Sequence, residues 1–98
     1  MPEATLYDAD ETLPQSITLD AKEERELLEV YGESTVSTDF SLDVSVDGIR
    51  WINDIKTYST VTRVSEGFWN TYRFVRFRSK GAGSAGDQVT LIISMRGV

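Results

Sequence analysis

Residues 36–47 read VSTDFSLDVSVD, and apolar and polar side chains alternate along this segment. The apolar residues share one face: Val36, Phe40, Leu42, Val44 and Val46. The polar residues share the other: Ser37, Asp39, Ser41, Asp43, Ser45 and Asp47. Successive side chains of a strand point to opposite sides, so this pattern predicts a strand with one buried and one solvated face.

The strand ends at Asp47-Gly48, which predicts a two-residue hairpin turn of type I′, because such a turn needs positive φ at both central positions. That turn would set the register of the next strand. The expected cross-strand pairs are Val46 with Ile49, Val44 with Trp51, and Phe40 with Ile55. Trp51 would then lie on the apolar face, and we predict that it is a core residue.

Further strands are predicted from alternation and from threonine, valine and tyrosine content, at residues 16–20, 55–65, 72–78 and 88–95. Glycine-rich residues 80–87 are expected to form an exposed loop. The segment 20–31 has features of both a short helix and a strand, since Asp20 and Glu23 suit a helix start whereas Leu28 and Val30 alternate with charge. A turn at 21–24 followed by a strand to Tyr31 is the preferred interpretation.

Short strands separated by turn signals predict an all-β fold, a small antiparallel β-sandwich of jelly-roll type. The 98 residues suit a single domain spanning 1–98, with residues 1–13 as a possible N-terminal arm.

Composition limits the chemistry. The chain has no histidine and no cysteine, so it lacks the usual general base, the commonest transition-metal ligand and any disulfide. We therefore expect no enzymatic activity and no cofactor. The net charge of −6 disfavours nucleic acid and anionic membranes as partners. No apolar run approaches the length of a membrane span, and the first residues do not resemble a secretion signal.

Two acidic sets could offer oxygen ligands to calcium. They are Asp8, Asp10 and Glu11, and Asp39, Asp43 and Asp47. Neither has the order of an EF-hand loop, and an Asp/Ser ladder is more often a solvated strand face, so no metal is expected.

Candidate contact residues fall into three groups. Arg73, Arg76 and Arg78 belong to a basic segment on an acidic protein, which suits docking between like copies better than nucleic-acid binding. Phe68 and Trp69 lie at a predicted turn, where large aromatic residues serve either as lids on the end of a sandwich or as contact anchors. In the N-terminal arm, Leu6 and Tyr7 could add a strand to the sheet edge of a neighbouring copy.

Three segments, DVSVDGIRW (43–51), EGFWNTYRFVRFRSKGAG (66–83) and QVTLIISM (88–95), resemble a recurring pattern in small β-sandwich proteins of tailed viruses. The resemblance covers residues 36–95. Residues 45–51 and 72–76 are also similar to a motif of discoidin-like carbohydrate-binding domains, which are usually about half as long again.

The first resemblance implies a non-enzymatic structural protein of the virion, a capsid decoration or a head or tail accessory. Its expected partners are further copies of itself and other virion proteins, and the family supplies no catalytic residue. The alternative is a carbohydrate-binding β-sandwich module. Because such modules are usually attached to a catalytic partner, a chain running from its own Met1 to Val98 favours the virion role.

Overall fold

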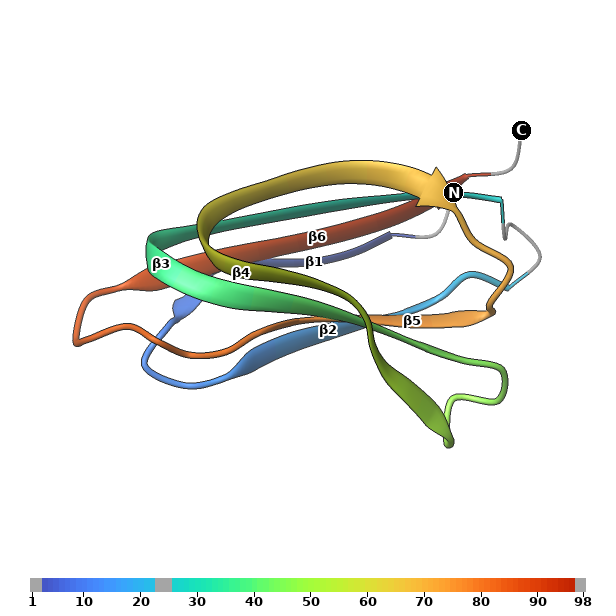
Figure 1. The fold of residues 1–98 in the computed structure, drawn as a ribbon, viewed down its shortest axis with the longest axis horizontal. Coiled ribbons are helices and arrows are strands. Elements are labelled where there is room, and N and C mark those ends of the chain that lie inside the picture. The colour runs from blue at the N-terminus through green and yellow to red at the C-terminus, as the bar shows by residue number, and fades with distance from the viewer. Residues whose placement is uncertain (1–2, 23–25, 97–98) are drawn as a thin grey trace.

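The computed structural model describes residues 3–22 and 26–96, which form six β-strands (Figure 1). They are β1 (Glu3–Asp10), β2 (Gln15–Asp20), β3 (Leu27–Ser45), β4 (Trp51–Trp69), β5 (Phe74–Ser79) and β6 (Gln88–Arg96). Within these described ranges, no helix is long and apolar enough to cross a membrane.

The two long strands, β3 and β4, belong to both layers of the fold. Residues 27–34 of β3 pair with β6, whereas residues 40–45 pair with β5. β4 follows β3 around this bend, with register shifts between Glu33 and Thr38, and Figure 1 shows both strands turning together at one end. Each long strand therefore contributes one half to each layer.

We call the two layers sheet I and sheet II. Sheet I has the order β1, β6, the first half of β3 and the second half of β4. Sheet II has the order β2, β5, the second half of β3 and the first half of β4. If each half of β3 and β4 is counted as a strand, β3 becomes strands 3 and 4, β4 becomes strands 5 and 6, β5 becomes strand 7 and β6 becomes strand 8. The two sheet orders are then 1-8-3-6 and 2-7-4-5, the arrangement of a jelly roll. The predicted antiparallel jelly-roll sandwich is confirmed.

The inward faces of both sheets form one apolar core. Phe40 and Phe77 are fully buried and stack with their ring centroids 5.6 Å apart. A Cβ atom on Gly32 would lie 2.8 Å from the Phe40 ring and 3.1 Å from the Phe77 ring. Glycine at this buried strand position therefore leaves the space that the two rings occupy.

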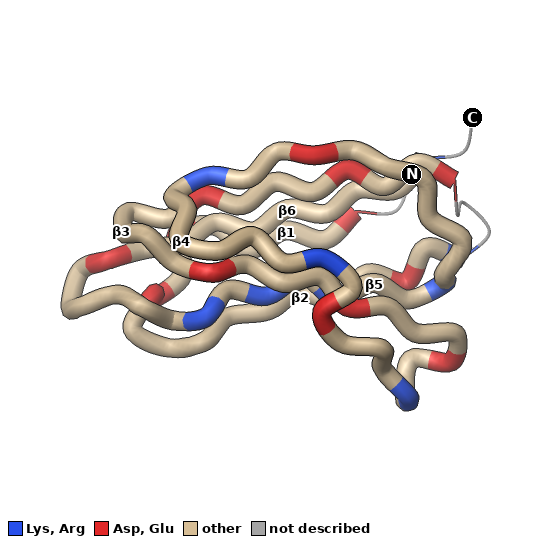
Figure 2. Tube along the Cα trace, viewed as in Figure 1, with Lys and Arg blue, Asp and Glu red and all other residues tan. Residues whose placement is uncertain are grey.

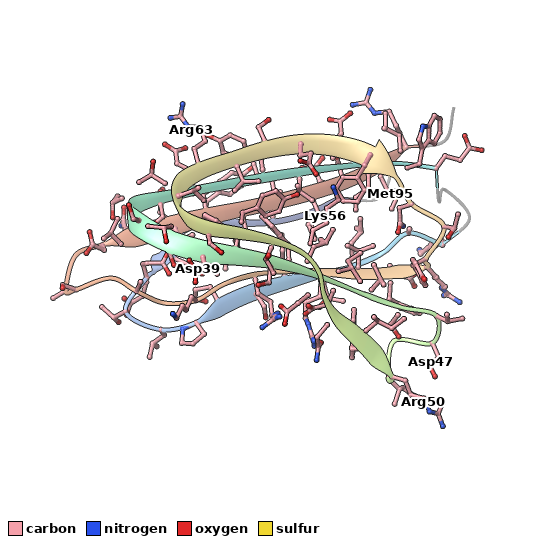
Figure 3. All side chains as sticks on the ribbon, viewed as in Figure 1. Asp39, Asp47, Arg50, Lys56, Arg63 and Met95 are labelled. Atoms are coloured by element: carbon pink, nitrogen blue, oxygen red, sulfur yellow. The ribbon has the colours of Figure 1, made fainter. Side chains whose placement is uncertain are left out.

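A polar cluster closes the sandwich where the two halves of β4 face each other. Glu66 accepts hydrogen bonds from Lys56 Nζ at 2.8 Å and from the Tyr58 hydroxyl at 2.9 Å. Lys56 also lies over the Phe68 ring, 4.6 Å from its centroid, and its position on β4 is labelled in Figure 3. These contacts join the β4 edge of sheet II to that of sheet I.

The predicted type I′ turn is wrong. Residues 46–50 form a longer loop whose only positive-φ residue is Gly48, at 79°. The Asp47 carboxylate accepts hydrogen bonds from the backbone N–H groups of Ile49 and Arg50, both at 2.8 Å. An aspartate that binds the backbone two and three residues ahead stabilises this wider loop. Asp47 and Arg50 lie at its tip (Figure 3).

The longer loop changes the register, so the prediction that Trp51 is a core residue is also wrong. Ser45 pairs with Trp51, Val44 with Ile52, and Phe40 with Tyr58. A shift of one residue moves a side chain to the opposite face of a sheet. Trp51 is consequently half-buried on the outer face of sheet II, while Val46 and Ile49 are exposed in the loop.

The other predicted strands are present with shifted ends. The strand interpretation of 20–31 is confirmed from Leu27 onward, and residues 23–25 of the expected turn lie outside the described residues. Residues 3–10, predicted as part of an arm for a neighbouring copy, instead form β1 and pair with β6 of the same chain. The loop 80–87 contains no strand.

A candidate binding groove on sheet I

The predicted contact residues do not form one surface. Leu6 and Tyr7 belong to β1, at one edge of sheet I, whereas Phe68 and Trp69 belong to β4 at its opposite edge. Leu6 packs partly against the core, and Tyr7 is exposed. Phe68 points inward beneath Lys56, while Trp69 points outward and is 69% exposed. Of these four residues, Tyr7 and Trp69 therefore present exposed rings, at opposite edges of sheet I.

The three arginines lie on sheet II or just before it, and each is paired within the chain. Arg73 makes a two-pronged contact with Asp20, at 2.8 and 3.0 Å. Hydrogen bonds from this guanidinium lower the pKa of Asp20 to about 2. Acidic and basic positions accordingly alternate over this part of the molecule instead of separating (Figure 2).

Asp43 is the buried centre of the other pairs. Its carboxylate accepts hydrogen bonds from Arg76 Nε at 2.8 Å and Arg78 Nε at 2.7 Å, and its own side chain is fully buried. Burial alone would raise the pKa of Asp43, but the hydrogen bonds from Arg78, the Asp54 amide and Arg76 outweigh it, so the pKa is lowered. The arginines thus serve a charged network on the outer face of sheet II.

The two segments that resemble discoidin-like domains meet at this network. The Arg76 guanidinium lies over the Trp51 ring, 4.3 Å from its centroid. Arg76 and Trp51 come from β5 and β4, which flank the second half of β3. A cation over an aromatic face is attractive, so Trp51 helps to hold this arginine.

Several of the acidic residues considered for calcium bind backbone N–H groups of this chain instead. Asp39 and Asp43 each accept, at 2.8 Å, the backbone N–H of a β4 residue with positive φ, Thr60 and Asp54 respectively. They stabilise two bulges of β4. Glu11 is buried and accepts the Gly81 N–H at 3.0 Å. Among the described residues, no three acidic, histidine or cysteine side chains lie where they could hold a metal ion.

A groove of about 430 Å³ lies on the outer face of sheet I. It runs over β3, β4 and β6 and is lined by Leu27, Glu29, Val30, Tyr31, Ser65, Glu66, Gly67, Ile92 and Ser94. The register explains the set, because Glu29 lies between Gly67 and Ser94, and Tyr31 lies between Ser65 and Ile92. Two adjacent rows of the sheet therefore supply one phenol ring, one carboxylate, two serine hydroxyls, one isoleucine and one glycine.

The polar groups of the groove are held in place before any ligand arrives. Arg96 Nη2 contacts the Glu29 carboxylate at 2.7 Å. The Tyr31 hydroxyl donates to Glu33 at 2.8 Å, and Arg63 contacts the other oxygen of Glu33 at 3.4 Å. The hydrogen bond to Glu33 raises the pKa of Tyr31, so the phenol stays neutral.

Gly67 leaves the β4 side of the groove open. A Cβ atom at this position would meet only Glu29 Cγ and the Leu28 carbonyl oxygen, both at 3.7 Å, an ordinary contact distance. Its backbone does not need glycine, since its φ is not positive. The missing side chain therefore shapes the groove rather than the fold.

Sequence reasoning did not find the groove. The signal that could have pointed to Glu29 and Tyr31 is their alternation with buried Leu28 and Val30. The contributions of Gly67 and Ser94 depend on strand pairing between segments far apart in the chain, and nothing local marks them.

The fold and the groove define a class, an all-β jelly-roll protein with an open polar and aromatic groove on one sheet. No protein-family model matches the chain, and no curated protein matches its sequence. The chain is similar to a solved structure titled "CpGH89CBM32-6 produced by Clostridium perfringens". The similarity covers 95% of this chain and 93% of that one, with 14% sequence identity and a TM-score of 0.48.

Proposed function

We propose that this chain is a non-catalytic module that binds a carbohydrate in the groove on sheet I. The observation that carries the proposal is the Tyr31 ring beside the pre-oriented Glu29 carboxylate, with the open Gly67 position opposite Glu29 on β4. This observation supports the carbohydrate-binding module, the alternative inferred from the sequence. The virion role stays a prediction.

The chemistry of the groove suits a sugar. A pyranose ring has an apolar face of C–H groups and a rim of hydroxyls, so it needs an aromatic surface and nearby hydrogen-bonding groups. Tyr31 offers an apolar body, and Glu29 offers acceptor oxygens, while Ser65 and Ser94 can donate or accept. A concave site with apolar walls and a few placed polar groups is the usual form of a small-ligand site.

The fixed side chains favour binding further. Ordering a free side chain on binding costs about 0.5–1.5 kcal/mol. Tyr31 and Glu29 are already held by Glu33 and Arg96, so a ligand would bear less of this cost. Trp69 adds a second exposed ring on the same face of β4, one row beyond Gly67 and two rows beyond Ser65, which pairs with Tyr31. A longer saccharide would reach this ring.

Replacing Gly67 with valine separates binding from stability. Valine would project into the groove without a positive-φ penalty, and a strand interior disfavours glycine by about 0.5–1 kcal/mol relative to alanine. We expect an equal or higher midpoint of urea unfolding. On an array of immobilised glycans, we expect the best-retained glycan to bind at least about tenfold more weakly, a loss of about 1.4 kcal/mol.

The matched control is Thr18→Val, an exposed position on β2 in sheet II, which should leave glycan retention unchanged. Failure of the natural protein to retain any glycan would contradict the proposal. Undiminished binding by Gly67→Val would remove the ligand from this groove.

A second candidate, protein assembly, is favoured by one observation at the loop between β3 and β4. Val46, Ile49 and Ile52 are 74%, 79% and 52% exposed, and all three lie in this loop or at the start of β4. Figure 1 shows that the loop projects from the body of the fold. Apolar surface of this kind suits a protein partner, which includes the virion role implied by the sequence resemblance.

The virion role predicts that an antibody against this chain detects it in purified virus particles from its source. Substituting Ile49→Asp should then reduce the amount incorporated, because a charge would be buried at the contact. Virus particles that lack the protein would contradict this second candidate.

A further inference from the structure

The jelly roll has four free strand edges among its described residues, and three of them are interrupted or short. β1 has a register shift between Leu6 and Ala9, with Asp8 at a φ of 51°. The first half of β4 has positive-φ residues at Asp54 and Thr60. β2 has only six residues. Bulges and short strands are the usual means by which proteins prevent edge-to-edge pairing.

The fourth edge, residues 63–69 of β4, lacks these features. Its register with β3 is unbroken from Glu33–Arg63 to Leu27–Trp69, and it contains neither proline nor a positive-φ residue. Such an edge presents a row of backbone donors and acceptors that only another strand satisfies in full. Figure 3 shows Arg63 projecting away from the body at one end of this edge.

We propose that two copies of this chain pair antiparallel through residues 63–69, around a twofold axis at Glu66. Two residues that lie opposite each other are then equally far in sequence from Glu66, one before it and the other after it. Arg63 lies opposite the partner's Trp69, Val64 opposite the partner's Phe68, and Ser65 opposite the partner's Gly67.

Each of these pairs is complementary. The exposed Trp69 ring gains the guanidinium of the partner's Arg63, a cation over an aromatic face, and each dimer contains this pair twice. Val64 and the partner's Phe68 extend the inward apolar faces of both copies. Ser65 and Gly67 are small enough for the strands to approach closely.

Neighbouring axes give worse pairs. An axis at Ser65 places Arg63 opposite glycine and Val64 opposite the partner's Glu66. An axis at Gly67 places Ser65 opposite the partner's Trp69 and Glu66 opposite the partner's Phe68. Only the axis at Glu66 joins the cation to the indole ring and the two apolar side chains to each other.

The proposed axis brings the negatively charged Glu66 side chains of the two copies close together, but each charge is compensated within its own copy. Glu66 is held by Lys56 Nζ and the Tyr58 hydroxyl, and the hydrogen bond from Lys56 lowers its pKa. Each copy thus brings a neutralised pair to the axis instead of a bare carboxylate.

Pairing would join the two grooves. Ser65 and Gly67 line the groove of their own copy and would face the partner's Gly67 and Ser65, so one surface would cross the interface. If the proposed function holds, the dimer would bind a long saccharide at two linked positions. The dimer itself does not rest on that function.

The absence of cysteine from the chain allows a register-specific test. We expect the natural protein to sediment as a dimer. Ser65→Cys mixed with Gly67→Cys should form a covalent heterodimer on mild oxidation, because directly opposite Cβ atoms lie about 4.5–5.5 Å apart. Each variant alone should cross-link far more slowly, since its cysteines would be about 7–8 Å apart. Thr18→Cys mixed with Ser65→Cys controls for random collision.

A monomer in sedimentation would overturn the proposal, and so would faster cross-linking of either variant alone than of the mixture. Trp69→Ala provides a second measurement, for which we expect a shift to a folded monomer. A dimer that retains no glycan would contradict the proposed function alone, whereas a glycan-binding monomer would contradict the dimer alone.

Discussion

Replacing Phe40 with alanine is expected to lower the free energy of unfolding by about 3–5 kcal/mol, the range for truncating a buried aromatic side chain. Phe40 is fully buried, stacks on Phe77 and lies against Gly32, so its removal leaves a cavity at the centre of the core. Urea unfolding followed by fluorescence measures the loss.

The matched variant is Trp51→Ala, a larger truncation that should cost less than about 2 kcal/mol. Trp51 is half-buried on the outer face of sheet II, and its main specific contact is the Arg76 guanidinium. A loss for Trp51→Ala equal to that for Phe40→Ala would show that Trp51 lies in the core and that the register of the hairpin differs from the one described.

The double substitution Arg76→Leu with Arg78→Leu is expected to cost about 3–5 kcal/mol at neutral pH, because it leaves a buried charge without its cations. Of the hydrogen-bond donors to Asp43 among the described residues, the Asp54 amide alone would remain. Adding Asp43→Asn should restore much of the loss, since the uncompensated charge disappears and the amide oxygen can still accept from Asp54.

The pH dependence of the double variant gives a second readout. In the natural protein the pKa of Asp43 is lowered, so its stabilising contribution is present above the unfolded pKa of about 3.9 and is lost as pH falls. Without the arginines, burial raises this pKa, and the sign reverses. The deficit of the double variant should therefore shrink as pH falls toward 4. A deficit that does not change with pH would contradict a buried carboxylate at this position.

Local alternation was sufficient to predict the strands and the class of fold. Val89, Leu91, Ile93 and Met95 share one face in the sequence, and all four are buried in β6. The period of two is a property of each strand by itself, so it does not depend on which neighbour the strand pairs with. For this reason the all-β sandwich could be predicted although the bend shared by β3 and β4 could not.

Register was decided by contacts that the alternation does not contain. Asp47-Gly48 fits a two-residue turn, but the Asp47 carboxylate binds two backbone N–H groups and stabilises a five-residue loop over positions 46–50. This small difference moved Trp51 from the expected core to the outer face.

The arginines and the groove also show the difference between what the local sequence predicts and what pairing between distant strands decides. The basic segment was visible in the sequence, but its neutralisation by Asp20 and Asp43 required β5 to lie between β2 and β3. Likewise Glu29, Gly67 and Ser94 meet only because β3 lies between β4 and β6. Strand formation follows from the spacing of side chains along one segment, whereas a site arises from pairing between distant segments, which only the packed tertiary structure determines.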